Sequence, residues 1–171
     1  MADLPLTLRH EHAADAATIT KLHERAFGPG RFAKTAYRLR EGVDAIPTLS
    51  FVALVGTLIV GSIRLTPIIV GRTSALLLGP LAVEQAFSSI GIGMNLVGRA
   101  VEAAKEEGHS LIFLVGDEPF YARAGFIVMP FNRVEMPGPV DPKRLLVLEL
   151  MDSALANVTG RISGVKRLAV A

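Results

Sequence analysis

The sequence predicts a single α/β (α+β) domain, with a mixed, mostly antiparallel sheet and one parallel strand pair after its central strand. Three observations support this. The middle of the chain holds apolar runs separated by tight-turn residues, which is typical of an antiparallel meander. A helical period follows, and then a continuous apolar run of the kind buried on both faces of a sheet. At 171 residues, the chain is long enough to bury such a core as one domain.

The first elements are a strand and two helices. Residues 6–9 alternate apolar and polar side chains, as a strand does. Residues 13–27 carry apolar side chains at helical spacing, and Gly28-Pro29-Gly30 ends that helix. Apolar side chains at 32, 36 and 39 indicate a second short helix, which Gly42 closes.

Three strands of the meander follow, at residues 49–55, 58–70 and 73–83. Glycine-containing turns separate them, so neighbours in sequence should pair as neighbours in the sheet. Pro67 and Pro80 lie inside the second and third runs. Because proline removes a ladder donor, each should mark an edge, a bulge or a strand break.

The parallel pair is predicted from the next segment. Residues 93–107 form a helical face that Gly108 ends, and residues 111–115 form a buried strand. A strand, a crossover helix and a second strand in this order should be right-handed and parallel. A short helix over 118–124 and two final strands, near 126–130 and 145–150, complete the expected sheet. The expected domain boundaries are 1–150 for the domain and 151–171 for a C-terminal appendage whose packing the pattern does not predict.

Composition excludes several classes of protein. There are no cysteines, which removes disulfides, thiolate catalysis and cysteine-based zinc sites. The net charge is +2. The only local excess of basic residues is Arg161, Lys166 and Arg167, which we interpret as a solvated tail. No nucleic-acid partner is therefore expected. The uncharged apolar stretch over residues 49–63 is shorter than the roughly 20 apolar residues of a membrane helix. With no secretory signal in view, we expect a cytoplasmic protein without a membrane partner.

The segment that carries chemistry follows the third meander strand, at residues 84–93. A loop whose backbone N–H groups open a helix is an anion site, and Gly91 and Gly93 leave its backbone accessible. Ser88 and Ser89 can cap the helix or donate to phosphate oxygens. An ordinary capped loop with two turn glycines is the alternative. A phosphate-binding P-loop is excluded because no lysine follows Gly93, and the dinucleotide fingerprint lacks its third glycine.

Two runs in order give the chain a family resemblance. The first run leads into the glycine loop and reads Leu78-Gly79-Pro80-Leu81-Ala82-Val83. The second run follows the helix and reads Leu114-Val115-Gly116-Asp117-Glu118-Pro119-Phe120-Tyr121-Ala122-Arg123-Ala124-Gly125-Phe126. Over roughly residues 5–150 the chain resembles the GNAT superfamily. The similarity is greatest to a bacterial branch of predicted N-acetyltransferases in which Val-Gly-Asp leads to Tyr-x-x-x-Gly-Phe. The resemblance implies helices on both faces of the sheet, and acetyl-CoA as cosubstrate.

The resemblance also implies where acetyl-CoA binds. In the family, amides of the loop Gln/Arg-x-x-Gly-x-Gly/Ala hold the CoA pyrophosphate, and the strand before it pairs with the pantetheine arm. The implied cofactor-binding residues are Leu81, Ala82, Val83, Ser88, Ser89, Ile90, Gly91, Ile92, Gly93 and Met94. The loop departs from the family, since Ser88 replaces Gln or Arg, Ser89 a common glycine, and Ile90 a basic or small residue. Losing the guanidinium removes a charge-assisted contact of about 1.5–3 kcal/mol.

Acetyl transfer needs an acid for the departing thiolate and a base for the amine. The resemblance implies Tyr121 as the acid. Glu84, just past the central strand, is the candidate base, although a solvated loop residue is the competing interpretation. Glu118 and Asp117 are alternative bases, and Asp117 is also expected to cap the following helix.

The acceptor site and the metal content are predicted from the N-terminal half. In this fold the linker between the first two helices borders the acceptor, so Arg31, Phe32 and Tyr37 are candidate substrate-binding residues, with simple helix punctuation as the alternative. His10 and His12 share one face of a strand, but a metal site needs a further ligand, so we expect surface histidines and no metal.

Direct acetyl transfer to an amine of a small molecule or peptide is therefore the predicted function. The altered loop leaves an alternative open, a non-catalytic GNAT-fold module that senses CoA or acyl-CoA or acts through a partner. Homodimerisation through a sheet edge or the C-terminal tail is also left open.

Overall fold

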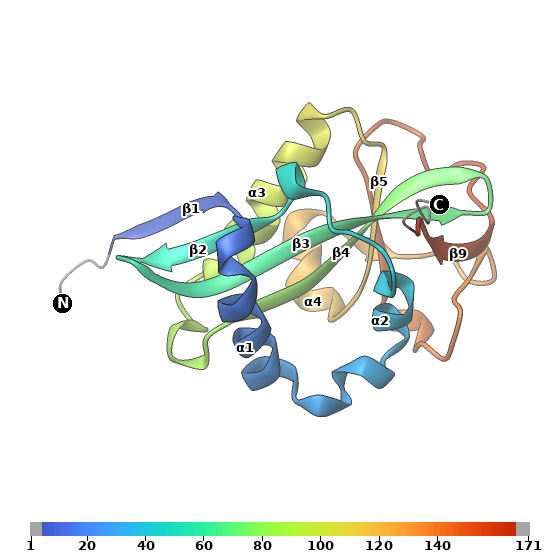
Figure 1. The fold of residues 1–171 in the computed structure, drawn as a ribbon. Coiled ribbons are helices and arrows are strands. Elements are labelled where there is room, and N and C mark those ends of the chain that lie inside the picture. Colours follow the sequence, from blue (N-terminus) through green and yellow to red (C-terminus); the bar gives the residue numbers. More distant parts are fainter. Residues whose placement is uncertain (1–4, 167–171) are drawn as a thin grey trace, which may run out of the picture.

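The computed structural model describes residues 5–166, except for the side chains of Phe32 and Ala33. Its main sheet has the strand order β1-β2-β3-β4-β5-β8-β6 (Figure 1). Neighbouring strands are antiparallel except β4 and β5, which are parallel. The predicted fold class is thereby confirmed. The strands are β1 (Leu6–His10), β2 (Phe51–Val55), β3 (Leu58–Val70), β4 (Thr73–Val83), β5 (Leu111–Val115), β6 (Ile127–Val128) and β8 (Leu145–Glu149).

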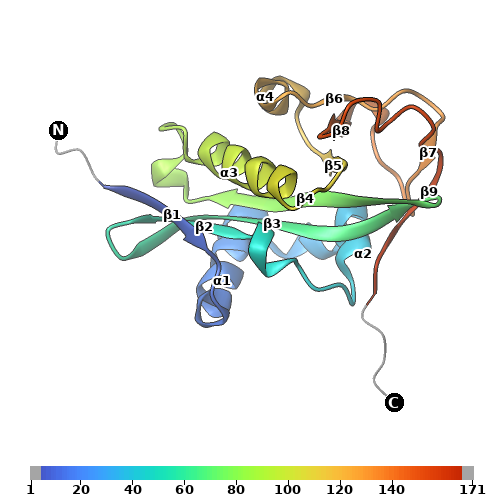
Figure 2. The same cartoon turned by 90° about the horizontal axis from the view of Figure 1, so that it is seen from above.

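Helices cover both faces of this sheet, as Figure 2 shows. One face carries α1 (Ala16–Phe27) and α2 (Thr35–Arg40), and the other carries α3 (Ile92–Glu106) and α4 (Glu118–Tyr121). Short 3-10 turns lie at Ala13–Asp15, Pro29–Ala33, Pro47–Leu49, Gln85–Phe87, Ala122–Ala124 and Pro142–Arg144. No helix in the described part of the chain is both long and apolar enough to span a bilayer.

Pro80 lies at a bulge, whereas Pro67 pairs regularly with Leu76 of β4 and lies between two partner strands on the other edge of β3. Ile63 pairs with Leu81 but Leu65 pairs with Leu78, so β4 holds one extra residue there, across Gly79 and Pro80. This is the bulge that a proline in a strand predicts. Pro67 lies on β3 between the segment paired with β2, which reaches Ile63, and the segment paired with β9, which begins at Ile68.

The parallel contact between β4 and β5 is short. Leu76 pairs with Ile112 and Leu77 with Phe113, and β4 then runs on to Val83 without a strand partner on this edge among the described residues. The bulge follows directly after the last pair, so it turns β4 away from β5. The two strands therefore diverge, and the space between them forms the candidate site.

The core lies on both faces of the sheet. Beneath α3 it is largely aliphatic, with fully buried Ile63, Leu76, Ile92 and Leu96, and it also holds Phe51 and Phe126. These side chains come from β3, β4 and α3, whose apolar positions recur with the strand period of two and the helical period of 3.6. A second cluster, near β9 and α2, holds Leu39, Ile68, Leu77, Phe113, Leu155, Val158 and Ile162.

The C-terminal segment joins that second cluster. Strand β9 (Gly160–Gly164) pairs antiparallel with β3 and parallel with β7 (Val134–Glu135), a pair that the sequence did not predict. Leu155, Val158 and Ile162 are buried, so residues 151–164 pack on the domain. Of the basic tail residues, Arg161 and Lys166 are exposed, and Arg167 lies outside the described residues.

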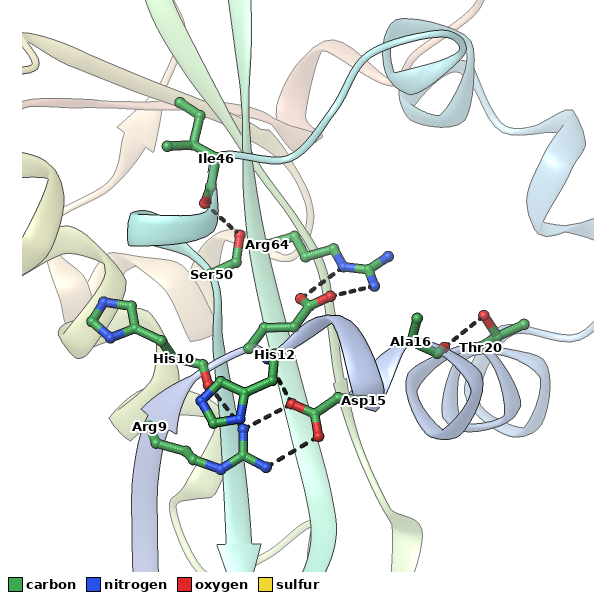
Figure 3. A network of polar contacts seen from close by, with 10 residues as sticks. Arg9, His10, His12, Asp15, Ala16, Thr20, Ile46, Ser50 and Arg64 are labelled. Carbon is green, nitrogen blue, oxygen red and sulfur yellow. Dashed lines mark hydrogen bonds and ion pairs between the residues drawn. The ribbon is translucent and has the colours of Figure 1, made fainter.

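A polar network joins β1 and the start of α1 to β3 (Figure 3). Arg9 and the backbone N–H of His12 both donate to Asp15, and this pairing lowers the pKa of the Asp15 carboxyl to about 2. Arg64 on β3 donates to both carboxylate oxygens of Glu11, at 3.0 and 2.7 Å. The charge of Arg64 is therefore neutralised within the fold. His10 and His12 are exposed and point apart in Figure 3.

Candidate functional site

A cavity of about 270 Å³ opens where β4 and β5 diverge. Its walls come from both faces of the sheet, so it connects the side covered by α1 and α2 with the side covered by α4. The lining residues are Phe27, Lys34, Ala36, Tyr37, Arg40, Leu78, Gly79, Pro80, Leu81, Val115, Gly116, Asp117, Phe120, Tyr121 and Arg144. Apolar walls with a few convergent polar groups are typical of a small-molecule site.

Tyr121 is held in this cavity by the end of β5. A Cβ atom at Gly116 would lie 2.5 Å from Tyr121 Cε2, so only glycine lets the ring pack against the backbone here. The ring also meets Phe120 and Phe126 edge-on, with centroids 4.8 and 5.9 Å apart. Gly116 therefore fixes the orientation of the tyrosine ring, which explains why glycine stands in Val115-Gly116-Asp117.

The electrostatic setting keeps the Tyr121 phenol protonated. Burial, and then the negative charge of Asp117, raise its pKa to about 12, although Arg40 and Arg144 oppose the shift. Tyr121 therefore holds its proton throughout the physiological range. It can donate that proton, or a hydrogen bond, to a basic atom that forms in the cavity.

The loop after β4 presents backbone donors at the start of α3. Gly91 has a φ of +87°, a left-handed conformation that favours glycine, and it is the N-cap of the helix. Helical bonding begins when Asn95 N–H donates to the Gly91 carbonyl at 3.0 Å. The N–H groups of Ile92, Gly93 and Met94 precede that bond, so they are left for another acceptor.

The side chains of the loop contribute less than its backbone. Ser88 Oγ donates to the Gln85 carbonyl at 2.8 Å, and the residues from Ser88 to Gly91 are exposed. Ile92 is fully buried in the core, so only its main chain can face a ligand. Gly93 packs closely, since a Cβ there would lie 3.3 Å from Phe120 Cζ and would press on that ring.

Of the three candidate bases, only Asp117 lines the cavity that holds Tyr121. Glu84 forms an ion pair with Arg25 of α1 and does not line the cavity. Asp117 does line it, but its carboxylate lies 3.5 Å from Arg144 and is 79% exposed. The expectation that Asp117 caps α4 is wrong, because the side chain makes no capping hydrogen bond and faces Arg144 instead. Glu118 is exposed on the first turn of α4.

Two of the three expected acceptor residues have described side chains. Tyr37 lines the cavity. Arg31 is buried and donates to the Gly28 carbonyl at 2.8 Å, so it also stabilises the turn between α1 and α2. The Phe32 side chain lies outside the described part of the structure. Within residues 5–166, no three His, Asp or Glu side chains gather as a metal site.

Sequence reasoning missed Arg40 and Phe120. Arg40 closes the last turn of α2 and lines the cavity, although an arginine at a helix end reads as a solvated residue that complements the helix dipole. Phe120 precedes Tyr121 and could have been predicted as a wall, since it stands in the same short helix.

Comparison with known proteins decides the family. The model of the acetyltransferase (GNAT) family matches residues 16–126. The chain belongs to this family. The curated protein "Uncharacterized N-acetyltransferase YhbS" of Escherichia coli K12 is 29% identical over 160 residues, which cover 92% of this chain and 95% of YhbS. YjhQ of the same organism, also described as an uncharacterized N-acetyltransferase, is 28% identical over 156 residues, or 87% of this chain and 86% of YjhQ.

Solved GNAT structures agree. The crystal structure of Escherichia coli YhbS in complex with CoA matches with a TM-score of 0.82 at 26% identity, over 96% of this chain and 92% of that one. A GNAT acetyltransferase from Brucella melitensis in complex with acetyl-CoA matches with a TM-score of 0.61 at 26% identity, over 89% and 99%. The predicted GNAT membership and the acyltransferase class are therefore confirmed, and the acetyl-CoA prediction agrees with the ligands of these relatives.

Proposed function

We propose that this chain transfers the acetyl group of acetyl-CoA directly to an amine of a small molecule or peptide. The observation that carries the proposal is the cavity between β4 and β5, which Tyr121 lines together with residues of α1 and α2 from the other face of the sheet. A thioester can enter from one face and an amine from the other, so the two reactants meet beside the phenol. Proximity of this kind is a main source of rate in a two-substrate transfer.

The chain offers acetyl-CoA a main-chain binding surface. The N–H groups of Ile92, Gly93 and Met94 and the positive end of the α3 dipole suit the CoA phosphates. The open edge of β4 from Leu81 to Val83 suits the pantetheine amides, because this edge has no strand partner among the described residues. Backbone recognition makes the loss of the usual Gln or Arg at Ser88 tolerable.

The transfer itself balances without a covalent enzyme intermediate. The amine nitrogen attacks the thioester carbonyl carbon, an N–C bond forms, the C–S bond breaks, and the amine proton leaves to water. Tyr121 protonates the departing thiolate and recovers its proton from solvent. The products are the N-acetyl amine and CoA with a free thiol. Tyr121 suits this role because it is protonated at neutral pH and lies in the cavity.

Substituting Tyr121→Phe tests the proposal. We expect kcat to fall about 10²-fold or more, the usual contribution of a positioned acid, while the Kd for acetyl-CoA changes little. Calorimetric titration with acetyl-CoA and CoA measures binding, and a thiol-release assay over a panel of amines measures turnover. Tyr37→Phe is the matched control, because it removes a hydroxyl from the same cavity and should alter the KM of the amine rather than kcat.

Each outcome separates the candidates. Unchanged kcat in Tyr121→Phe would exclude the acid role. Tight binding of acetyl-CoA with no turnover of any amine would favour a CoA-sensing module, which the exposed Ile90 in place of a basic residue also suits. Absence of any binding would refute both functions.

A further inference from the structure

Arg40 lines the site, and it has no ion-pair partner within residues 5–166. It ends α2, and its Nη2 atom approaches Gly79 so closely that a Cβ there would lie 2.5 Å away. Its Cζ atom stands 5.2 Å from the centroid of the Tyr37 ring. The Nε atom is fully buried, and no hydrogen bond to it is found among the described residues. Burial lowers the pKa of this guanidinium to about 10.

The neighbouring arginines Arg64 and Arg144 differ from Arg40 in having a carboxylate partner, whereas Arg40 and Lys34 each stand over an aromatic ring. Arg64 donates to both oxygens of Glu11 (Figure 3), and Arg144 pairs with Asp117 at 3.5 Å. Lys34 stands over the Phe27 ring at 5.7 Å. For Arg40, no carboxylate within the described chain comes into ion-pair range, although the exposed Glu41 is adjacent in sequence.

A second cavity, of about 310 Å³, adjoins the first at Arg40. Tyr37, Arg40, Gly79 and Pro80 line both cavities, and the polar residues His23, Glu41, Arg64 and Thr66 belong to the second. His23 Nε2 and Thr66 Oγ1 are fully buried there without a hydrogen-bond partner in the described structure. Buried polar atoms are normally satisfied, so the three unpaired groups around this cavity, with Arg40 Nε, favour a polar rather than an apolar occupant.

The second cavity lies on the face of the sheet that carries α1 and α2, because α1 supplies His23 and α2 supplies Tyr37 and Arg40. The start of α3, where the phosphates of acetyl-CoA are proposed to bind, is on the opposite face (Figure 2). The acceptor therefore has to reach the thioester from the side of Arg40. The orphan groups of the second cavity are then available to the acceptor rather than to the cosubstrate.

We propose that the acceptor is a small amine that also carries an oxyanion, a carboxylate or a phosphate, and that Arg40 binds this oxyanion. The inference rests on the proposed acetyl transfer and names its substrate class. A guanidinium offers a planar fork of donors that fits either oxyanion in a bidentate manner. Such a partner would neutralise the buried charge, which nothing in the described chain does.

The charges around the second cavity leave Arg40 as the cation without an ion-pair partner among the described residues. Burial, and then the positive charges of Arg64, Arg40 and Arg31, lower the pKa of His23 to about 4, so this imidazole is neutral at physiological pH. Arg64 is paired with Glu11, and Glu41 lines the cavity without an ion pair to Arg40. An amine with an oxyanion enters with its charge balanced, and the charge of Arg40 favours loss of the amine proton before attack.

Matched pairs of probes test the assignment. The panel contains amino acids against their carboxamides, phosphoethanolamine against ethanolamine, and spermidine. We expect wild-type kcat/KM for the preferred amine with an oxyanion to exceed that of its partner without the oxyanion by roughly 10- to 150-fold, the range of one charge-assisted contact. The carboxylate and phosphate arms show which oxyanion is preferred. Calorimetric binding of the same probes to the CoA-loaded protein gives a second readout that does not need turnover.

Arg40→Met keeps the apolar stem and removes the charge, so it should abolish the preference for the anionic member of each pair. Arg40→Lys should keep part of it, because it retains the charge but loses the fork. The Kd for acetyl-CoA should change little in both variants. A wild-type preference for the amines without an oxyanion, or for spermidine, would overturn the proposal. Loss of acetyl-CoA binding in Arg40→Met would also overturn it. Arg40-dependent binding of anionic amines without turnover would support the oxyanion site and refute the acetyl transfer.

Discussion

Gly116→Ala should misplace Tyr121 without touching its hydroxyl. The added Cβ would lie 2.5 Å from Tyr121 Cε2 and 3.1 Å from Leu114 Cδ1, whereas carbon atoms normally sit about 3.5–4.0 Å apart. The ring must therefore move by about 1 Å, although Phe120 and Phe126 already pack against it. Overpacking of this kind costs about 1–3 kcal/mol of stability. A 1 Å error in a catalytic group costs about 10²-fold in rate.

The assay compares kcat, acetyl-CoA affinity and urea unfolding in Gly116→Ala and in a control variant. Gly116→Ala should lower kcat by about 10²-fold with little change in the Kd for acetyl-CoA. Gly98→Ala is the matched control, because it makes the same change on the exposed side of α3, where a Cβ would meet nothing within 4 Å. It should leave kcat unchanged and stabilise the helix by about 0.5–1 kcal/mol.

A double variant shows whether the effect passes through the phenol. If Gly116→Ala acts by displacing Tyr121, adding it to Tyr121→Phe should lower kcat little further, since coupled residues are not additive. Full additivity would mean that Gly116 acts independently of the hydroxyl. A Gly116→Ala protein with wild-type kcat and wild-type stability would refute the contact between residue 116 and the ring.

Two further predictions follow from charged groups near the site. His23 has a pKa lowered to about 4 against 6.5, so its neutral form favours folding above pH 6.5, and about 3 kcal/mol of that stability should be lost as pH falls to 4. Urea unfolding at pH 7 and at pH 4.5 should show most of this loss in the wild type and much less of it in His23→Gln. Both pH values lie above the pKa of about 2 of Asp15, so that carboxyl stays ionised in the folded protein. For Glu84→Gln, we expect kcat within about threefold of wild type and at most about 1 kcal/mol less stability, because the carboxylate pairs with Arg25 outside the cavity. A loss of about 10²-fold in kcat would instead establish Glu84 as the base.

The sequence predicted correctly those strands and helices whose ends are set by neighbouring turn residues. Strands β3 and β4 occur at 58–70 and 73–83 as predicted, because turn residues flank apolar runs there. Strands β7 and β9 escaped prediction because they are short and owe their pairing to distant partners. A Cβ at Gly164 would lie 2.2 Å from the Leu39 carbonyl oxygen, so β9 depends on a close approach to α2 that no local pattern encodes.

The residues of the site divide in the same way, into those that nearby sequence positions and those that depend on distant parts of the chain. Tyr121 could be proposed from sequence because Gly116, which orients it, lies five positions away within one recognisable run. Arg40 could not, since an arginine in the last turn of a short helix is ordinarily solvated. Its burial depends on Gly79, a residue of β4 that is remote in sequence and comes close only in the fold.

The irregularity at Gly79 and Pro80 links the two halves of the site. The extra residue of β4 falls just after the last pair with β5, so the bulge marks where the strands separate and the cavity with Tyr121 begins. The same Gly79 lacks the Cβ that would block Arg40, so the guanidinium reaches this opening from the other face of the sheet. Arg40 in turn is close enough to Tyr121 to oppose the rise in its pKa. One local departure from strand geometry therefore places the proposed acid and the proposed oxyanion ligand around a single opening, where thioester and amine can meet.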